Sequence, residues 1–253
     1  MLQPEFLITG ASYSMLSILL SGAGGRVGGE IRQLVDADPG LQIVGIAGRE
    51  RWFAGETDAD VLIDFSRPDS TARCVEFALQ QRLPLVIGTT GLPPELQQGI
   101  DAAAERIPIC QAANFSIGVN FLLELVERAA AGLPDSFDIE ISEIHHRWKV
   151  DAPSGTALAL GRAAAAARGQ DHDRVASIRS DGARAAGQIG YQVSRGGDVI
   201  GEHSVMFLGE GERLELTHRA SDRAIFARGA LHAARWLLDR PPGLYSMRDV
   251  LRA

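Results

Sequence analysis

The sequence contains very little cysteine, with only Cys74 and Cys110 among 253 residues. Two cysteines cannot form a disulfide framework, and their spacing fits no metal-binding motif. Cys74 lies in a helix-like pattern and Cys110 ends an apolar run, so we expect both to be buried free thiols. This cysteine usage indicates a reducing compartment, and we predict a cytoplasmic protein.

An excess of positive charge is also missing. Lys and Arg total 25 against 32 Asp and Glu, which gives a formal net charge of −7. A nucleic-acid partner is therefore not expected, because phosphate binding needs a basic surface. The 28 glycines and 11 prolines show no repeating period, which excludes collagen-like and low-complexity chains. A local basic pocket for a small anion remains open.

No uninterrupted apolar run is long enough to span a membrane. Residues 6–25 carry no charge, but serines, threonine and glycines interrupt them. No Lys or Arg precedes the stretch, so the positive region of a signal peptide is missing. A strand over Met15–Leu20 that leads into a glycine-rich turn explains the pattern better. We predict no membrane role and treat residues 1–14 as a leader or a cloning scar.

The first folded unit is predicted to be strand, glycine turn and helix. The spacing G-x-G-x-x-G fails because position 27 is valine, but G-x-x-G-x-x-G is satisfied by Gly22, Gly25 and Gly28. Such glycines permit a tight bend, close approach to a pyrophosphate and close packing of helix on strand. A helical apolar face follows and ends near Asp38. The pattern favours a dinucleotide site, and an ordinary glycine-rich turn is the alternative.

The ribose-recognition position is predicted to follow a second strand over Leu41–Ala47. The residues there are Gly48, Arg49, Glu50 and Arg51. The acid that would accept the ribose hydroxyls of NAD is not clearly in place. Arg49 and Arg51 offer donors for a 2′-phosphate, while Glu50 opposes that interpretation. NADPH and NADH both remain open as cofactors.

Strands and helices continue to alternate, as in a parallel sheet. We expect strands over 61–65, 85–88 and 107–110, and helices over 69–81 and 93–104. Ligands of open α/β sheets bind at the carboxyl ends of the strands. The loops Gly88–Thr90 and Ala112–Phe115 lie at that edge and are candidates to contact nicotinamide and ribose, or are simple turns.

After a helix over about 118–131, the pattern changes to strands. Polar and apolar residues alternate over 137–144 and 212–218, and 188–193 and 203–208 add two strand-like runs. The alternation predicts a sheet with one solvated or partner-covered face. A loop over 178–187 is expected to be mobile, and a last helix over 222–238 to return to the first domain. The fold class is therefore α/β, with a Rossmann-like, mostly parallel sheet domain and a second α+β domain.

Potentially cationic residues gather between His145 and Thr156. His145, His146, Arg147 and Lys149 fall within five residues at the end of an alternating strand. In an acidic protein this indicates an anion pocket or a proton-donating site, with a solvated loop as the alternative. Asp151 can neutralise or orient one of the cations. The Pro-Ser-Gly-Thr that follows opens a helix whose free N–H groups can hold a carboxylate or phosphate. No metal is expected, because no partner shows the usual zinc spacing.

The chain resembles the dihydrodipicolinate reductase family from about Met15 to its C-terminus. The resemblance rests on seven ordered motifs: GAGGRVG (22–28), VLIDFSRP (61–68), VIGTTG (86–91), AANFSIGVN (112–120), EIHHRWKVDAPSGTA (143–157), RGGDVIGEH (195–203) and MRDVL (247–251). It implies NADH- or NADPH-dependent reduction of a cyclic imine dicarboxylate in the diaminopimelate route to lysine. It also implies a homotetramer built through the second domain's open mixed sheet.

The resemblance assigns roles residue by residue. His145 matches a proton donor and acceptor, and Lys149 a proton donor. The substrate would be bound by His146, Ser154, Gly155 and Thr156. The cofactor would be bound by Gly22, Ala23, Gly24, Gly25, Arg26, Val27, Arg49, Gly88, Thr89, Thr90, Ala112, Ala113, Asn114 and Phe115. The implied domains are 15–116 completed by 221–253 for the dinucleotide, and 117–220 for substrate and oligomerisation.

The sequence also departs from the family pattern. Trp148 replaces a histidine of the basic motif, the segment between Arg49 and Val61 is short, and Gly48 stands where an acid is common. We therefore predict that NADPH is used at least as well as NADH. A short-chain dehydrogenase is disfavoured because the sequence has no Tyr-x-x-x-Lys pair. A non-enzymatic NADPH-sensing module and a reductase of another cyclic imine acid remain alternatives.

Overall fold

The computed structural model describes residues 15–48, 52–53, 55–178 and 182–252. The chain forms two compact units. Unit 1 lies within Met1–Ile109 and Ala234–Gly243, and unit 2 is Cys110–Ala233 with Leu244–Ala253. The predicted leader at 1–14 and the arginines at 49 and 51 fall outside the described residues. The predicted domain boundaries stay a prediction.

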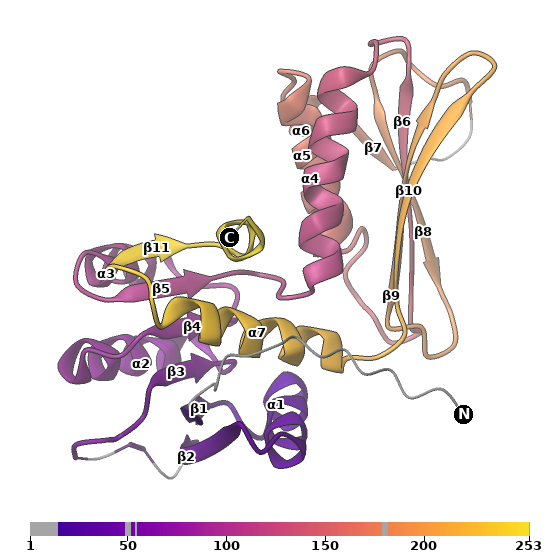
Figure 1. Cartoon of the computed structure of the whole chain (residues 1–253). Coiled ribbons are helices and arrows are strands. Elements are labelled where there is room, and N and C mark those ends of the chain that lie inside the picture. Colours follow the sequence, from indigo (N-terminus) through magenta and orange to yellow (C-terminus); the bar gives the residue numbers. More distant parts are fainter. Residues whose placement is uncertain (1–14, 49–51, 54, 179–181, 253) are drawn as a thin grey trace, which may run out of the picture. The chain divides into compact units, whose positions relative to one another are not determined.

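Unit 1 is built around a sheet in which β1 joins parallel neighbours on both sides (Figure 1). The strand order is β11-β5-β4-β3-β1-β2, and the pairings from β2 to β4 are parallel. The order of connection reverses between β1 and β3, which is the point where open α/β sheets bind ligands. The elements are β1 (Leu16–Ser21), α1 (Arg26–Ala37), β2 (Leu41–Ala47), β3 (Val61–Asp64), α2 (Pro68–Gln81), β4 (Leu85–Ile87), α3 (Pro94–Ala104), β5 (Pro108–Gln111) and β11 (Gly243–Tyr245).

Helices α2 and α3 cover one face of this sheet with a continuous apolar core. Phe77 and Ala78 of α2 and Ile100 of α3 pack on Leu62 and Leu85 of the strands. The strands are apolar on both sides, as parallel strands between helices are. Cys74 belongs to this core, and both cysteines are buried free thiols, as predicted. Burial raises the pKa of Cys110 to about 12, so that thiol is inert as a nucleophile.

Unit 2 is a mixed five-stranded sheet packed on helices α4 and α5 (Figure 1). Its strand order is β10-β9-β6-β8-β7, with β6 parallel to β8 and antiparallel to β9. The elements are α4 (Ile117–Gly132), β6 (Asp138–His145), α5 (Gly155–Ala167), α6 (His172–Val175), β7 (Ala176–Ile178), β8 (Ile189–Arg195), β9 (Gly201–Leu208), β10 (Arg213–Ala220), α7 (Ala224–Leu237) and α8 (Met247–Leu251), with α7 continuing into unit 1.

One face of the unit 2 sheet changes from apolar to polar along its strands. Ile139 and Ile141 of β6 pack with Val205 of β9 and with Leu160 of α5 in the buried core. Side chains on a strand alternate between faces, so residues 143 and 145 continue the same face. The residue at 143 is glutamate and the one at 145 is histidine. The core therefore ends where polar side chains begin, at the carboxyl end of β6.

The fold class expected from the sequence is confirmed. Most predicted elements appear within two residues of their expected ends, while α6, β7, β11 and α8 were not predicted. The loop was expected to begin at residue 178, but Ile178 is the last residue of β7 and pairs with Tyr191 of β8. Residues 179–181 of that loop lie outside the described part of the chain. No helix among the described residues has the length and hydrophobicity needed to cross a membrane.

Candidate active site

The glycine turn after β1 is fixed by close backbone contacts within unit 1. Gly22 has φ +85°, and a Cβ there would lie 2.1 Å from the carbonyl oxygen of Phe65. A Cβ on Gly28 would lie 2.2 Å from the carbonyl oxygen of Gly22. These two glycines therefore serve the bend and the close packing of α1 on the turn. A Cβ on Gly24 would meet nothing within 4 Å, so that position is open toward solvent.

The N-terminus of α1 has the character of a phosphate site. Gly25 is its N-cap, no side chain caps it, and no acid lies in its first turn. The N–H groups of the first turn therefore keep their donors and the positive end of the helix dipole for an anion. Arg26 is exposed at the same end. These features fit a dinucleotide pyrophosphate, although the assigned residues stay a prediction.

A buried acid joins the loops that follow β3 and β4. Asp64 is fully buried and accepts hydrogen bonds from the hydroxyls of Ser66, Thr71 and Thr89, the last at 2.9 Å. The Thr89 oxygen in turn accepts the N–H of Ser66 at 3.0 Å. The side chain of Thr89 is therefore used inside the protein, and only its backbone could face a cofactor. A Cβ on Gly88 would lie 2.2 Å from the ring of Phe65, which explains that glycine.

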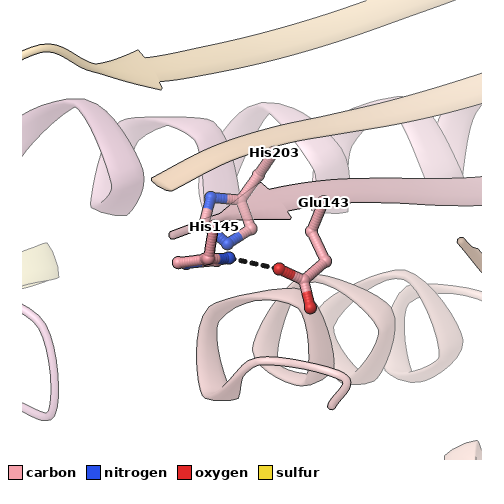
Figure 2. A group of neighbouring side chains, drawn as sticks. All are labelled: Glu143, His145 and His203. Atoms are coloured by element: carbon pink, nitrogen blue, oxygen red, sulfur yellow. Dashed lines mark hydrogen bonds and ion pairs between the residues drawn. The ribbon is translucent and has the colours of Figure 1, made fainter. Parts of the chain in front are cut away.

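Strands β6, β8 and β9 bring Glu143, His145, Arg195 and His203 together in unit 2. Figure 2 shows Glu143, His145 and His203 of this cluster. In the β6–β9 pairing Glu143 lies opposite His203, and in the β6–β8 pairing His145 lies beside Arg195. Glu143, His145 and His203 are all buried. The rings of His145 and His203 meet edge to face, with centroids 5.0 Å apart. Sheet register thus assembles the cluster from residues up to 60 positions apart in the sequence.

The carboxylate of Glu143 is the centre of this cluster. Its Oε2 contacts Nδ1 of His145 and accepts from Nη1 of Arg195 at 3.0 Å. Its Oε1 accepts from Nη2 of Arg195 at 2.9 Å and from the N–H of Ser154 at 3.0 Å. Burial alone would raise the pKa of Glu143, but these donors hold it below its usual value. Glu143 is therefore an ionised carboxylate with four donors.

The two histidines are neutral at physiological pH. Burial lowers the pKa of His145, and Glu143 offsets only part of that effect. Burial, followed by the neighbouring His145, lowers the pKa of His203 to about 4. Nε2 of His203 lies 3.1 Å from Oγ of Ser154. A buried imidazole with a depressed pKa gives up its proton readily, which suits proton transfer.

Glu143, His145 and His203 also have the donor types of a metal site. One ligand atom from each lies within 4.8 Å of the others. This grouping has no metal-ligand spacing along the sequence, because His203 comes from a different strand than Glu143 and His145. The four donors on Glu143 already occupy its lone pairs, and the guanidinium of Arg195 would repel a cation there. The donor set therefore fits an ion-pair cluster better than a metal centre.

Lys149 lies in the loop after β6 and is held by an acid. Its Nζ is 2.8 Å from both carboxylate oxygens of Asp151, as expected from the sequence. That bond from Lys149 lowers the pKa of Asp151. His146 is half-buried, whereas Arg147 is exposed and Trp148 has 71% of its surface exposed. Of the predicted cationic run, Arg147 thus lies outside the buried cluster.

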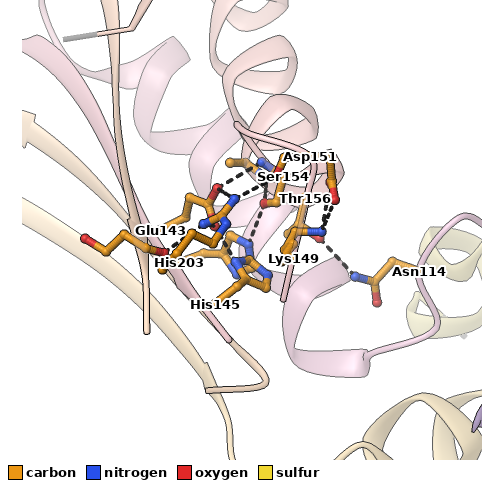
Figure 3. Close-up of polar contacts among 11 residues, drawn as sticks. Asn114, Glu143, His145, Lys149, Asp151, Ser154, Thr156 and His203 are labelled. Carbon is orange, nitrogen blue, oxygen red and sulfur yellow. Dashed lines mark hydrogen bonds and ion pairs between the residues drawn. The ribbon is translucent and has the colours of Figure 1, made fainter. Parts of the chain in front are cut away.

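The N-terminus of α5 is the place where the sequence predicts an anion cradle, and that role stays a prediction (Figure 3). Ser154 is the N-cap, and its Oγ accepts from the N–H of Ala157 at 3.2 Å. Gly155 and Thr156 form the first turn, where N–H groups have no partner within the helix. Nδ2 of Asn114 donates to Oγ1 of Thr156 at 3.3 Å. The structure thus links a predicted cofactor segment to the predicted substrate segment within unit 2.

Sequence reasoning missed Asp64, Glu143, Arg195 and His203 as site residues. Each lies in one of the motifs quoted above, but none was given a role. For Glu143 a signal was present, because it is a charged residue at an inward position of an alternating strand. His203 and Arg195 become visible only through strand pairing.

Comparisons with known proteins cover both units. Residues 16–115 match the family described as dihydrodipicolinate reductase, N-terminus, and residues 118–251 the family described as dihydrodipicolinate reductase, C-terminus. A relative from Anaeromyxobacter sp., named 4-hydroxy-tetrahydrodipicolinate reductase, is 46% identical, covering 94% of this chain and 98% of its own. A relative of the same name from Pseudoalteromonas translucida is 52% identical over 78% of this chain and 75% of its own.

A solved structure shares the fold. Dipicolinate-bound dihydrodipicolinate reductase from Paenisporosarcina sp. TG-14 has a TM-score of 0.75 at 24% identity, covering 94% of this chain and 100% of that one. Amine dehydrogenase from Mycobacterium smegmatis has a TM-score of 0.55 at 12% identity, covering 93% and 96%. Both likenesses concern the fold alone.

Proposed function

The chain belongs to the dihydrodipicolinate reductase family and reduces 4-hydroxy-tetrahydrodipicolinate in the diaminopimelate route to lysine, and from this premise we propose which residues carry the reaction. Unit 1 binds the nicotinamide cofactor on the turn Gly22–Val27, and unit 2 binds the substrate between His145 and Thr156. The observation that carries the proposal is the cationic cluster near the first turn of α5, in an acidic protein.

The substrate is a dianion, and unit 2 offers it several donors. The N–H groups of Gly155 and Thr156 and the hydroxyl of Ser154 hold one carboxylate at the positive end of α5. His146, which is half-buried in the loop after β6, is a further proposed substrate ligand. A cationic surrounding lowers the cost of bringing a doubly charged ligand out of water.

We assign proton transfer to His145 and Lys149. A bound reduced nicotinamide would supply a hydride, and the negative charge left on the conjugated ring would be balanced by one proton. Lys149 donates a proton from its Nζ, and His145 donates and accepts one in the buried cluster. Asp151 holds the Nζ in place until substrate binds.

Lys149→Ala tests this assignment. Reduced-nicotinamide oxidation is followed with enzymatically generated substrate, and cofactor binding is measured separately by fluorescence. We expect turnover to fall at least 100-fold while cofactor affinity stays within twofold. Unchanged turnover would remove Lys149 from the mechanism. Binding without turnover in the wild-type protein would favour a sensing module, and turnover of a different cyclic imine acid would redefine the substrate.

The cofactor preference is a finer question. A nicotinamide cofactor goes with the family, and we propose that NADPH is used at least as well as NADH. The support comes from the sequence alone, in which Gly48 and Arg49 follow β2 and an acid is missing at position 48. Kinetics with both cofactors test it, and a large preference for NADH would refute it.

We also propose a homotetramer that assembles through the unit 2 sheet. The buried apolar core of unit 2 lies on one face of this sheet. The other face carries Ser142, Ser204, Met206 and Thr217, all partly accessible, with Oγ of Ser204 2.9 Å from Oγ1 of Thr217. Light scattering should give four times the chain mass of 27.1 kDa. A monomer at micromolar concentration would contradict this assembly.

A further inference from the structure

Glu143 divides its two oxygens between the proposed proton donor and the proposed substrate cradle. Oε2 contacts Nδ1 of His145, while Oε1 accepts the N–H of Ser154 at 3.0 Å. Arg195 bridges both oxygens at 3.0 and 2.9 Å, which fixes the plane of the carboxylate. The Glu143 side chain itself has no exposed surface. One buried group therefore sets the positions of two functional parts of the site.

This contact decides which nitrogen of His145 carries the proton. An ionised carboxylate only accepts hydrogen bonds, so Nδ1 of the neutral imidazole must be the protonated nitrogen. Nε2 is then free to take up and release a proton. A Cβ on residue 201 would lie 3.0 Å from this Nε2, and the residue there is glycine. The absence of a side chain at Gly201 keeps that nitrogen accessible.

We propose that Glu143, anchored by Arg195, is a positioning residue that holds His145 as the Nδ1–H tautomer and fixes Ser154 at the start of the substrate cradle. The proposal rests on the proposed function for its kinetic consequences, but not for the tautomer. Glu143 contacts His145 and Ser154 directly, and Arg195 contacts Glu143. Both act through His145 and Ser154, as outer partners of functional histidines do elsewhere.

The electrostatic surroundings give the proposal a pH signature. Lys149, Arg195 and His203 face His145 as cationic or neutral groups, and Glu143 is the acid that raises its pKa. Replacing Glu143 by glutamine removes that acid, so the pKa of His145 should fall further. An amide nitrogen beside Nδ1 and the guanidinium also favours the opposite tautomer, because it donates where the carboxylate accepted.

The experiment compares Glu143→Gln with a matched variant, Glu140→Gln. Glu140 is a buried glutamate on the same strand and is paired with an arginine, Arg184, at 3.1 Å. It lies on the opposite face from His145, because 140 and 145 differ by an odd number. Both substitutions therefore remove a buried Glu–Arg pair from β6, and only one of them touches His145.

Two readouts are measured on each protein. The ¹⁵N shifts of the imidazole nitrogens, in protein labelled at its six histidines, report the tautomer of His145 without substrate. The pH profile of kcat reports its titration under turnover. For Glu143→Gln we expect the tautomer to change, kcat to fall 10- to 100-fold, and the acidic limb to move to lower pH. Glu140→Gln should keep the wild-type tautomer and profile.

The outcomes separate this inference from the proposed function. A wild-type His145 protonated at Nε2 when neutral overturns the inference, whatever the activity. Glu143→Gln with wild-type tautomer and pH profile also overturns it, even if kcat falls. If Glu143→Gln does not fold, Arg195→Lys takes its place, since it keeps one cationic donor and should give an intermediate loss. Failure of the wild-type protein to reduce the substrate would refute the proposed function, and the tautomer would still test the inference.

Discussion

Asp64 in unit 1 and Glu143 in unit 2 are both buried acids near the carboxyl end of a strand, with exposed fractions of 0% and 1%. Their partners differ in charge and in chemistry. Those of Asp64 are neutral hydroxyls, whereas Glu143 has a guanidinium, an amide and an imidazole. The same residue class thus serves two different purposes in one chain.

The difference indicates what each acid does. The hydroxyls of Ser66, Thr71 and Thr89, here called the Asp64 shell, do not titrate in the physiological range. The hydrogen bonds that these three residues donate to Asp64 therefore do not depend on the protonation of the partners. His145, which contacts Glu143, does titrate. The position of the Glu143 carboxylate is in turn fixed by the permanently charged Arg195. We infer that Asp64 maintains the framework of the cofactor turn, and that Glu143 serves proton transfer.

The largest difference is expected when each acid is removed. Glu143→Ala leaves the Arg195 guanidinium, with 18% of its side chain exposed, without its carboxylate partner, and among the described residues only the carbonyls of Ser194 and Asp151 still accept from it. This should lower the free energy of unfolding by about 3–5 kcal/mol. Asp64→Ala leaves three hydroxyls that can turn to other acceptors, and we expect a loss of about 1–3 kcal/mol. Chemical denaturation of both variants measures the two losses, and a larger loss for Asp64→Ala would reverse the comparison.

A smaller loss of stability is expected when the pH is lowered. The pKa of His203 falls from 6.5 to about 4 on folding. Between these values the unfolded chain takes up a proton that the folded chain refuses, so stability decreases as the pH falls from about 6.5 to about 4. For this one group the loss reaches about 3 kcal/mol. His203→Gln keeps a donor toward Ser154 but does not titrate, and should remove most of that loss.

Unfolding curves at pH 7 and pH 4.5 measure this effect in both proteins. Thr71→Ser is the control, because it retains the Asp64 shell of unit 1 and should keep the wild-type acid sensitivity. An equal loss of stability for wild type and His203→Gln would show that the acid sensitivity does not lie in the Glu143 cluster.

Local patterns explain how much of the fold followed from sequence. Runs such as Leu41–Ala47 match their strand end to end, because strand and turn residues are read locally. The short elements α6 and β11, of four and three residues, carry too few positions for a periodicity to show. β11 is formed by its pairing with β5, which a local pattern does not show.

The candidate site also contains residues that the sequence predicts and residues that it does not. Contiguous residues such as His145, Lys149 and Ser154 could be found from their motif. Partners across strands could not, because Glu143 meets His203 only through the register of β6 on β9. The polar residue at an inward position of β6 was the available signal, since a charge there must be paired inside the protein. Arg195 is that pair.

The smallest expected effect concerns one hydroxyl of the unit 1 shell. Thr89→Val removes the donor to Asp64 at 2.9 Å and the acceptor of the Ser66 N–H at 3.0 Å, while it keeps the shape of the side chain. We expect a loss of about 1–2 kcal/mol in unfolding free energy. Because Ser66 follows the strand that packs on the Gly22 turn, cofactor affinity should also weaken several-fold. Thr89→Ser restores the hydroxyl and should recover both quantities. If the valine variant weakens stability but binds cofactor normally, the Asp64 shell supports the fold alone.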